Sequence, residues 1–207
     1  MNKTLTDKAL KVPVMETFYS IQGEGKYQGQ AAFFIRLAGC DVGCHWCDVK
    51  ESWAIADDQY VAIDALVAEA QSHATDLIII TGGEPFTHNL DKLTAALKEK
   101  DYQINVETAG VYPITGSIDW VCLSPKKFKE VLPEYYPIAH ELKIVISNRH
   151  DIKWAEELAE KVSSICRLYL QPEWSKRDTT TDLIVEYVKN NPRWSISLQT
   201  HKYMNIP

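Results

Sequence analysis

Residues 40–47 read CDVGCHWC, and this loop carries three cysteines at spacings of four and three residues. Thiolates are soft ligands that favour iron–sulfur clusters, zinc or Cu(I). In a cubane cluster each iron takes a terminal ligand, and cysteine normally supplies all of them. Cys40, Cys44 and Cys47 therefore leave one iron of such a cluster free to bind a molecule that is not protein. The loop predicts chemistry as well as scaffolding.

The same loop admits a second interpretation, a structural zinc site completed by His45 or by a remote residue. That site would make the protein a non-enzymatic zinc-binding module. We interpret His45 as an ordinary loop residue and Trp46 as a shield of the cluster from water. The chain has five cysteines, an odd number, and three of them are clustered, which favours metal ligation over a disulfide framework.

Length and composition set the class of protein. The chain of 207 residues suits a single domain, with residues 1–13 as a lead-in. Its net charge of −6 provides no electrostatic footprint for nucleic acid. No apolar run reaches the roughly 18 residues that span a bilayer, and the polar N-terminus has no signal-peptide core. We expect a cytoplasmic protein without nucleic-acid or membrane partners.

Apolar runs alternate with amphipathic segments along the chain, which predicts a parallel sheet of about six or seven mainly parallel strands connected by helices. The run at residues 77–80 (LIII) is typical of a strand covered on both faces. Eight full βα units need about 250 residues, so we expect an α/β fold of the partial, shortened βα barrel type. The predicted strands are 14–19, 33–38, 76–80, 103–107, 118–123, 141–147, 166–170 and 194–198, and the predicted helices are 61–73, 89–100, 151–162 and 180–190.

Polar residues gather after the carboxyl ends of these strands, where active sites form in parallel βα architectures. Gly23 and Gly25 flank Glu24 and would let the backbone approach a ligand closely. Arg36 interrupts an apolar strand and needs a partner there. That partner is either an internal carboxylate or a substrate carboxylate gripped by two of the guanidinium nitrogens.

With these motifs in hand, the Cys-x3-Cys-x2-Cys loop resembles the signature of the radical S-adenosylmethionine (SAM) superfamily. The segments IQGEG (21–25) and QTHKY (199–203) narrow the resemblance to the 7-carboxy-7-deazaguanine synthases, over nearly the whole chain. The resemblance implies a [4Fe–4S] cluster on Cys40, Cys44 and Cys47, SAM and Mg²⁺ as cofactors, a homodimer, and a reductant such as flavodoxin.

The reaction implied by the resemblance is that of a lyase in queuosine or other 7-deazapurine biosynthesis. It converts 6-carboxy-5,6,7,8-tetrahydropterin to 7-carboxy-7-deazaguanine and ammonia, by hydrogen abstraction at C6 and ring contraction. The alternative within the superfamily is a glycyl-radical activating enzyme, which acts on a protein and should lack both the IQGEG segment and the C-terminal tail.

The resemblance also assigns residues. Backbone groups at Gly82 and Gly83 meet the SAM amine, and the Glu84 carboxylate adds a charge-assisted bond. The other SAM contacts are Ser124, Pro125, Lys126, Gln171 and Pro172. The implied substrate contacts are Ile21, Gln22, Gly23, Glu24, Arg36, Thr81, His201 and Pro207.

One position departs from the family. Val49 stands where the family commonly has a threonine or serine whose hydroxyl binds Mg²⁺. Valine has no side-chain oxygen, and Mg²⁺ is a hard ion that requires oxygen ligands. Asp48 or water could replace the ligand, or Lys50 could supply positive charge instead. We expect reduced Mg²⁺ dependence.

Overall fold

The computed structural model describes residues 10–47 and 49–207. The strands are β1 (Lys11–Ile21), β2 (Ala31–Leu37), β3 (Tyr60–Ala62), β4 (Leu77–Gly82), β5 (Gln103–Thr108), β6 (Trp120–Leu123), β7 (Glu141–Ile146), β8 (Arg167–Pro172) and β9 (Trp194–Ile196). The helices are α2 (Ile63–Gln71), α3 (Asp91–Lys98), α4 (Arg149–Ala159), α5 (Arg177–Asn190) and α6 (Thr200–Met204).

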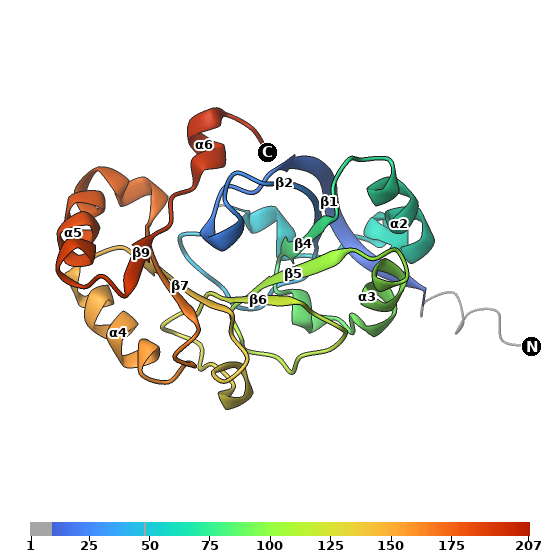
Figure 1. The fold of residues 1–207 in the computed structure, drawn as a ribbon. Helices are drawn as coiled ribbons and strands as arrows, with labels where there is room; N and C mark the ends of the chain where they lie inside the picture. Colours follow the sequence, from blue (N-terminus) through green and yellow to red (C-terminus); the bar gives the residue numbers. More distant parts are fainter. Residues whose placement is uncertain (1–9, 48) are drawn as a thin grey trace, which may run out of the picture.

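All of these strands belong to one curved sheet (Figure 1). Within the described residues its order is β3-β1-β2-β4-β5-β6-β7-β8-β9. From β2 to β9 each neighbouring pair is parallel, whereas β1 pairs antiparallel with β2 and with β3. Because the order runs from β3 to β9 without returning, the described sheet stays open, and the predicted partial βα barrel is confirmed.

Three segments differ from the prediction. The predicted helix 61–73 begins only at Ile63, because Val61 pairs with Val12 and extends the sheet as β3. The predicted lead-in of residues 1–13 ends earlier than expected, because Lys11 already pairs with Ala62 in β1; residues 1–9 lie outside the described part. The tail of the chain forms the short helix α6, which the hydrophobic pattern did not indicate.

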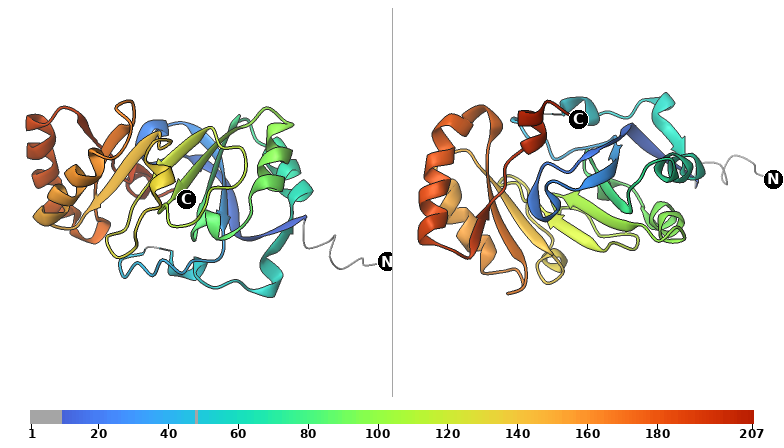
Figure 2. Two further views of the ribbon diagram at one scale, coloured as in Figure 1. Left: turned by 90° about the horizontal axis from the view of Figure 1, so that it is seen from below. Right: turned by 45° about the horizontal axis from the view of Figure 1, so that its top comes forward.

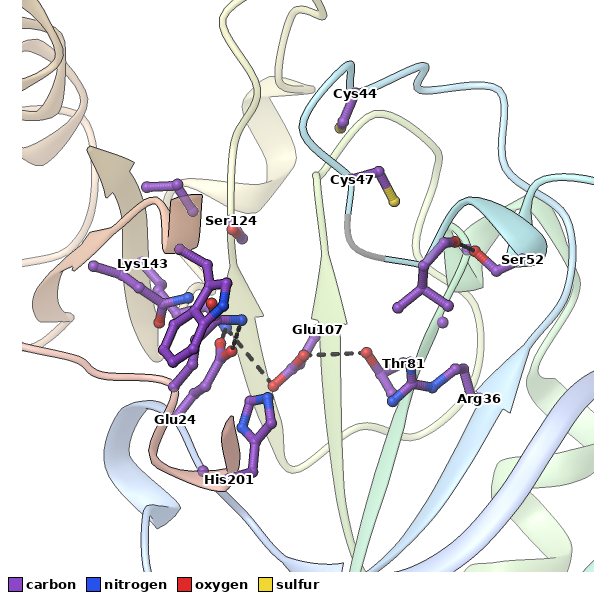
Figure 3. Close-up of a pocket in the computed structure, with 18 of the residues that line it drawn as sticks. Glu24, Arg36, Cys44, Cys47, Ser52, Thr81, Glu107, Ser124, Lys143 and His201 are labelled. Atoms are coloured by element: carbon purple, nitrogen blue, oxygen red, sulfur yellow. Dashed lines mark hydrogen bonds and ion pairs between the residues drawn. The ribbon is translucent and has the colours of Figure 1, made fainter. Parts of the chain in front are cut away.

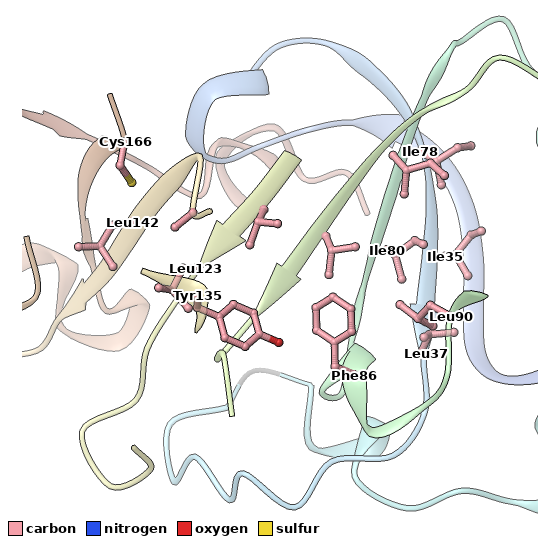
Figure 4. Close-up of a cluster of buried hydrophobic side chains, with 14 of the residues drawn as sticks. Ile35, Leu37, Ile78, Ile80, Phe86, Leu90, Leu123, Tyr135, Leu142 and Cys166 are labelled. Carbon is pink, nitrogen blue, oxygen red and sulfur yellow. The ribbon is translucent and has the colours of Figure 1, made fainter. Parts of the chain in front are cut away.

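Helices α2 to α5 cover the outer face of the sheet, as the two further views show (Figure 2). Alternate strand residues point outward into the main core, including Ile35, Leu37, Ile78 and Ile80, with Phe86 and Leu90 packed against them (Figure 4). The intervening Phe34 and Ile79 belong to a separate cluster. The continuous apolar run of β4 is therefore explained by burial on both of its faces.

The two-residue period of strands decides which side chains face the inside of the sheet. The residues that alternate with the outer core positions are largely polar toward the strands' carboxyl ends. They are Arg36 on β2, Thr81 on β4, Glu107 on β5, Lys143 on β7 and Gln171 on β8. The pleat thus gathers five strands' polar residues on one concave side.

Candidate functional site

A cavity of about 800 Å³ lies on the concave side of the sheet. Its walls come from the carboxyl ends of β2, β4, β5, β6, β7 and β8, the loop after β1, the cysteine loop and the C-terminal tail (Figure 3). Ligand pockets commonly measure about 300–1,000 Å³, so this cavity is large enough for a cofactor and a small substrate together.

Most of the site residues expected from sequence line this one cavity. Pro125 does not line it, and Asp48 lies outside the described residues. The expected residues that do line it are Ile21, Gln22, Gly23, Glu24, Arg36, Cys40, Cys44, Cys47, Val49, Thr81, Gly82, Gly83, Glu84, Ser124, Lys126, Gln171, Pro172, His201 and Pro207.

The cysteine loop forms one wall of the cavity (Figure 3). Cys44 is buried with Val42 and Ala109, and Cys40 and Cys47 pack against this cluster. Burial raises the pKa of the Cys40 and Cys44 thiols, so a bound metal centre is needed to hold them as thiolates at neutral pH. In the described part of the chain no three His, Cys, Asp or Glu side chains are placed to hold one metal ion.

Gly83 joins the cysteine loop to the end of β4. A Cβ at Gly83 would lie 2.1 Å from the carbonyl oxygen of Gly39, so only glycine fits there. The same oxygen accepts from the Glu84 amide at 3.0 Å. The strand end and the start of the cysteine loop are therefore in direct backbone contact.

The Glu84 side chain points into the protein and is buried. Its Oε1 accepts from Thr108 Oγ1 at 2.6 Å and its Oε2 from the Ala109 amide at 2.7 Å. Burial raises the pKa of this carboxyl. The carboxylate thus fastens the loop after β4 to Thr108, at the end of β5, and to the Ala109 amide that follows it.

Lys126 and Gln171 both line the cavity. The Lys126 ammonium donates to Ser124 Oγ at 3.0 Å and lies 5.6 Å from the centroid of the Trp46 ring, and burial lowers its pKa. Gln171 Oε1 accepts from Ser197 Oγ at 2.9 Å. Both side chains are thereby held in place at the cavity wall.

The glycines of the IQGEG segment let the loop approach other parts of the protein closely. A Cβ at Gly23 would lie 2.2 Å from His201 Nδ1, and a Cβ at Gly25, whose φ is +62°, would lie 2.4 Å from Glu141 Oε1. The Thr200 amide donates to the Gly23 carbonyl at 3.0 Å. These glycines thus dock the loop onto the C-terminal tail and β7, a role for close approach that differs from the expected one toward a ligand.

Arg36 has the internal carboxylate that the sequence left as one of two alternatives. Its Nε lies 3.1 Å from Glu16 Oε1, and its guanidinium carbon lies 5.3 Å from the centroid of the Phe18 ring. The buried Nε–H nevertheless has no hydrogen-bond partner of good geometry among the described residues. Since Arg36 also lines the cavity, the guanidinium keeps donors for an anionic ligand.

Sequence reasoning missed Glu107 and Lys143, which occupy the floor of the cavity between Glu24 and Thr81 (Figure 3). Lys143 pairs with Glu24, and its Nζ lies 3.8 Å from Glu107 Oε1. Thr81 Oγ1 donates to Glu107 Oε2 at 3.1 Å. The sequence did contain a pattern that could have identified Lys143, because this residue is a lone cation in an apolar strand just as Arg36 is.

Comparison with known proteins places the chain in a family. The model of the Radical SAM superfamily matches residues 34–119. A 7-carboxy-7-deazaguanine synthase of Flavobacterium psychrophilum is 54% identical over 201 residues, which cover 97% of this chain and 95% of the relative. This chain belongs to the 7-carboxy-7-deazaguanine synthase family.

Other relatives agree with that assignment. The synthase of Synechocystis sp. is 44% identical over 94% of this chain and 93% of its own length. The crystal structure of QueE from Escherichia coli superposes with a TM-score of 0.84 at 30% identity, covering 95% of this chain and 98% of the other. The open barrel is therefore the fold of the family. Among the described residues no helix is both long and apolar enough to cross a bilayer.

Proposed function

We propose that this chain converts 6-carboxy-5,6,7,8-tetrahydropterin to 7-carboxy-7-deazaguanine and ammonia as a radical SAM lyase of 7-deazapurine biosynthesis. One observation supports this most directly. The cysteine loop and the polar floor face one another across a single cavity of about 800 Å³. A cofactor bound at the loop and a pterin bound on the floor would therefore be neighbours.

The cofactor end would use the cysteine trio for a [4Fe–4S] cluster and the surrounding strand ends for SAM. The cluster and SAM, when bound, supply the radical that abstracts hydrogen from C6. This chain's residues hold and shield them: the backbone at Gly82 and Gly83, with the side chains of Ser124 and Lys126, meets SAM. Gln171 and Pro172 line the same cavity. Pro125 would contribute as the residue that joins Ser124 to Lys126.

The substrate end would use Arg36 for the pterin carboxylate, because a guanidinium matches a carboxylate with two parallel donors. Gln22 and Glu24 would read the donor and acceptor edge of the pterin ring, and Ile21, Gly23, Thr81, His201 and Pro207 complete this end of the cavity. The Pro207 carbonyl accepts from Ser20 Oγ at 3.2 Å, so the tail is held against β1.

Mg²⁺ does not fit the described residues as it fits the family pattern. The Val49 side chain offers no oxygen, and its carbonyl already accepts from Ser52 Oγ at 2.7 Å. We therefore derive no step through Mg²⁺ and propose that turnover depends on it weakly. The proposal further includes a homodimer in the cytoplasm and a reductant such as flavodoxin.

The experiment is anaerobic reconstitution of the cluster, followed by incubation with SAM, dithionite and the carboxytetrahydropterin. Ultraviolet detection of the aromatic deazaguanine together with ammonia release is the expected result. Cys44→Ala serves as the control that cannot assemble the cluster. Protein that reductively cleaves SAM yet forms no deazaguanine would refute the proposed substrate.

A further inference from the structure

The floor of the cavity contains the buried ammonium of Lys143, a residue outside the sequence motifs described above. Lys143 lies on the concave face of β7, between the core residues Leu142 and Ile144, and is only 4% exposed. Its ammonium pairs with Glu24, from the loop after β1, and with Glu107, on β5. A buried charge is tolerated only when it is paired, so these three side chains form one electrostatic unit.

This unit holds one more negative charge than positive charge, because two carboxylates surround one ammonium. Glu24 Oε2 accepts from Lys143 and Oε1 from Gln199 at 2.9 Å. Besides its ion pair with Lys143, Glu107 accepts from two neutral donors, Gln22 Nε2 at 3.2 Å and Thr81 Oγ1 at 3.1 Å. Each carboxylate oxygen keeps lone pairs for a further donor. The floor is therefore suited to a ligand edge that presents N–H groups.

Other ionisable groups also face Lys143 and must be counted. Cys122 on β6 and Glu141 on β7 pair with each other on the same inner face as Lys143 but do not line the cavity, and Lys126 does line it. His201 of the tail faces Glu24. The Lys143 ammonium hydrogen-bonds the Glu24 carboxylate directly.

We propose that Lys143 is a positioning residue that determines specificity: by holding Glu24 as a carboxylate, it makes the floor accept the amino and N–H donors of a 2-aminopyrimidinone ring. The inference rests on the proposed function, since the pterin and its deazaguanine product both carry that ring edge. Lys143 acts through Glu24, and its own ammonium need not touch the substrate.

The titration behaviour agrees with the geometry. Burial alone would raise the pKa of Glu24, but the charge and hydrogen bond of Lys143 bring it below its ordinary value. Burial likewise opposes the charge on Lys143, yet Glu107 and Glu24 hold its pKa well above the usual value. Without the ammonium the burial remains, so the pKa of Glu24 would rise. A protonated Glu24 would donate a hydrogen bond where the ring requires an acceptor.

The test measures binding to the cluster-loaded, oxidised enzyme by calorimetry. The two probes are 7-carboxy-7-deazaguanine and the same compound without its 2-amino group. For the wild type we expect at least about tenfold tighter binding of the amino compound, with affinity nearly constant from about pH 6 to pH 8. A wild-type affinity that falls tenfold as the pH drops over this range would overturn the inference, because Glu24 would then be titrating.

Three variants test whether the positive charge of Lys143 is responsible for the preference. Lys143→Met should reduce the preference for the amino compound to about threefold or less at pH 7 and shift the acidic limb of binding to higher pH. Lys143→Arg keeps a cation and should restore the preference. Lys189→Met removes an exposed lysine on α5 and should behave as the wild type. An unchanged preference in Lys143→Met would overturn the inference.

Probe binding and turnover, measured together on the wild type, distinguish failure of the role of Lys143 from failure of the proposed function. Wild type that binds neither probe and forms no deazaguanine refutes the proposed function, whereas wild type that turns over but shows no preference refutes only the role of Lys143. Should Lys143→Met fail to fold, the pH series on the wild type and the preference of Lys143→Arg still decide, because both require only folded, charged protein.

Discussion

Gly83→Ala is the substitution whose effect the structure defines most directly. The added Cβ would lie 2.1 Å from the Gly39 carbonyl oxygen and 3.1 Å from Cys40 Cβ. Contacts this short require one of the two backbones to move. The Gly39 oxygen is not free to rotate away, since it accepts from the Glu84 amide at 3.0 Å. The substitution must therefore push the cysteine loop away from the end of β4.

The expected loss of stability follows from these contacts. Overpacking a filled site costs about 1–3 kcal/mol, and loss of the Glu84 amide bond adds about 1 kcal/mol. For a chain of this size each kcal/mol lowers Tm by about 2–4 °C, so Gly83→Ala should lower Tm by roughly 4–16 °C. Displacement of Cys40 should also reduce the iron bound after reconstitution to about half or less of the wild-type amount, a level set by the loss of one cluster ligand.

Gly29→Ala provides the matched control. A Cβ at Gly29 meets no atom within 4 Å, but its φ of +87° still imposes a backbone cost of about 1–2 kcal/mol. Thermal unfolding and iron analysis of both variants separate backbone cost from collision. We expect a lower Tm in both and lost iron in Gly83→Ala alone. A Gly83→Ala protein with wild-type iron content and a Tm no lower than that of Gly29→Ala would refute the argument.

Four further predictions follow from the site and the core. Arg36→Lys should raise KM for the pterin about tenfold or more, because lysine cannot form two parallel bonds to a carboxylate, while SAM cleavage without pterin stays within about twofold; equal losses in both assays would contradict a role in substrate binding. Val49→Thr supplies the missing hydroxyl, so Mg²⁺ should stimulate its turnover more than that of the wild type, and identical Mg²⁺ titrations would argue against a ligand role at this position. Burial raises the pKa of Cys166 to about 12 and that of Cys122 well above its usual value, so iodoacetamide at about pH 8 should modify neither thiol before unfolding; modified peptides from native protein, found by mass spectrometry, would show otherwise. Although burial opposes it, the hydrogen bond from Lys127 and two backbone amides lower the pKa of Asp151 below 3.8, so its contribution to stability is present above pH 3.8 and is lost as the pH falls through the lower, folded-state value. Asp151→Asn should therefore cost about 1–3 kcal/mol near neutral pH and progressively less in acid, as measured by urea unfolding, and a difference independent of pH would contradict this.

Several features of this protein are local enough to be predicted from the chain alone. The cysteine loop is contained within eight residues, 40–47, so its chemistry needs no tertiary information. The apolar run of β4 and the alternation of strands and helices are also local patterns, and they predict the parallel sheet. Strand pleating then requires that a polar residue two positions beyond a buried one faces the same side, as Arg36 follows Phe34.

The interaction partners of the buried polar side chains, and of one edge strand, were decided by the tertiary structure alone. The pair of Lys143 with Glu24 joins residues 119 positions apart, and the hydrogen bond between Glu84 and Thr108 joins the loop after β4 to the end of β5. Val61 became part of a strand because β1 offered an unpaired edge, although its own segment has helical periodicity. The hydrophobic periodicity of a segment indicates which of its faces is buried. It does not indicate which charged group another segment will bring to that face. For this reason the position of the cavity was predictable from sequence, whereas the electrostatics of its floor were not.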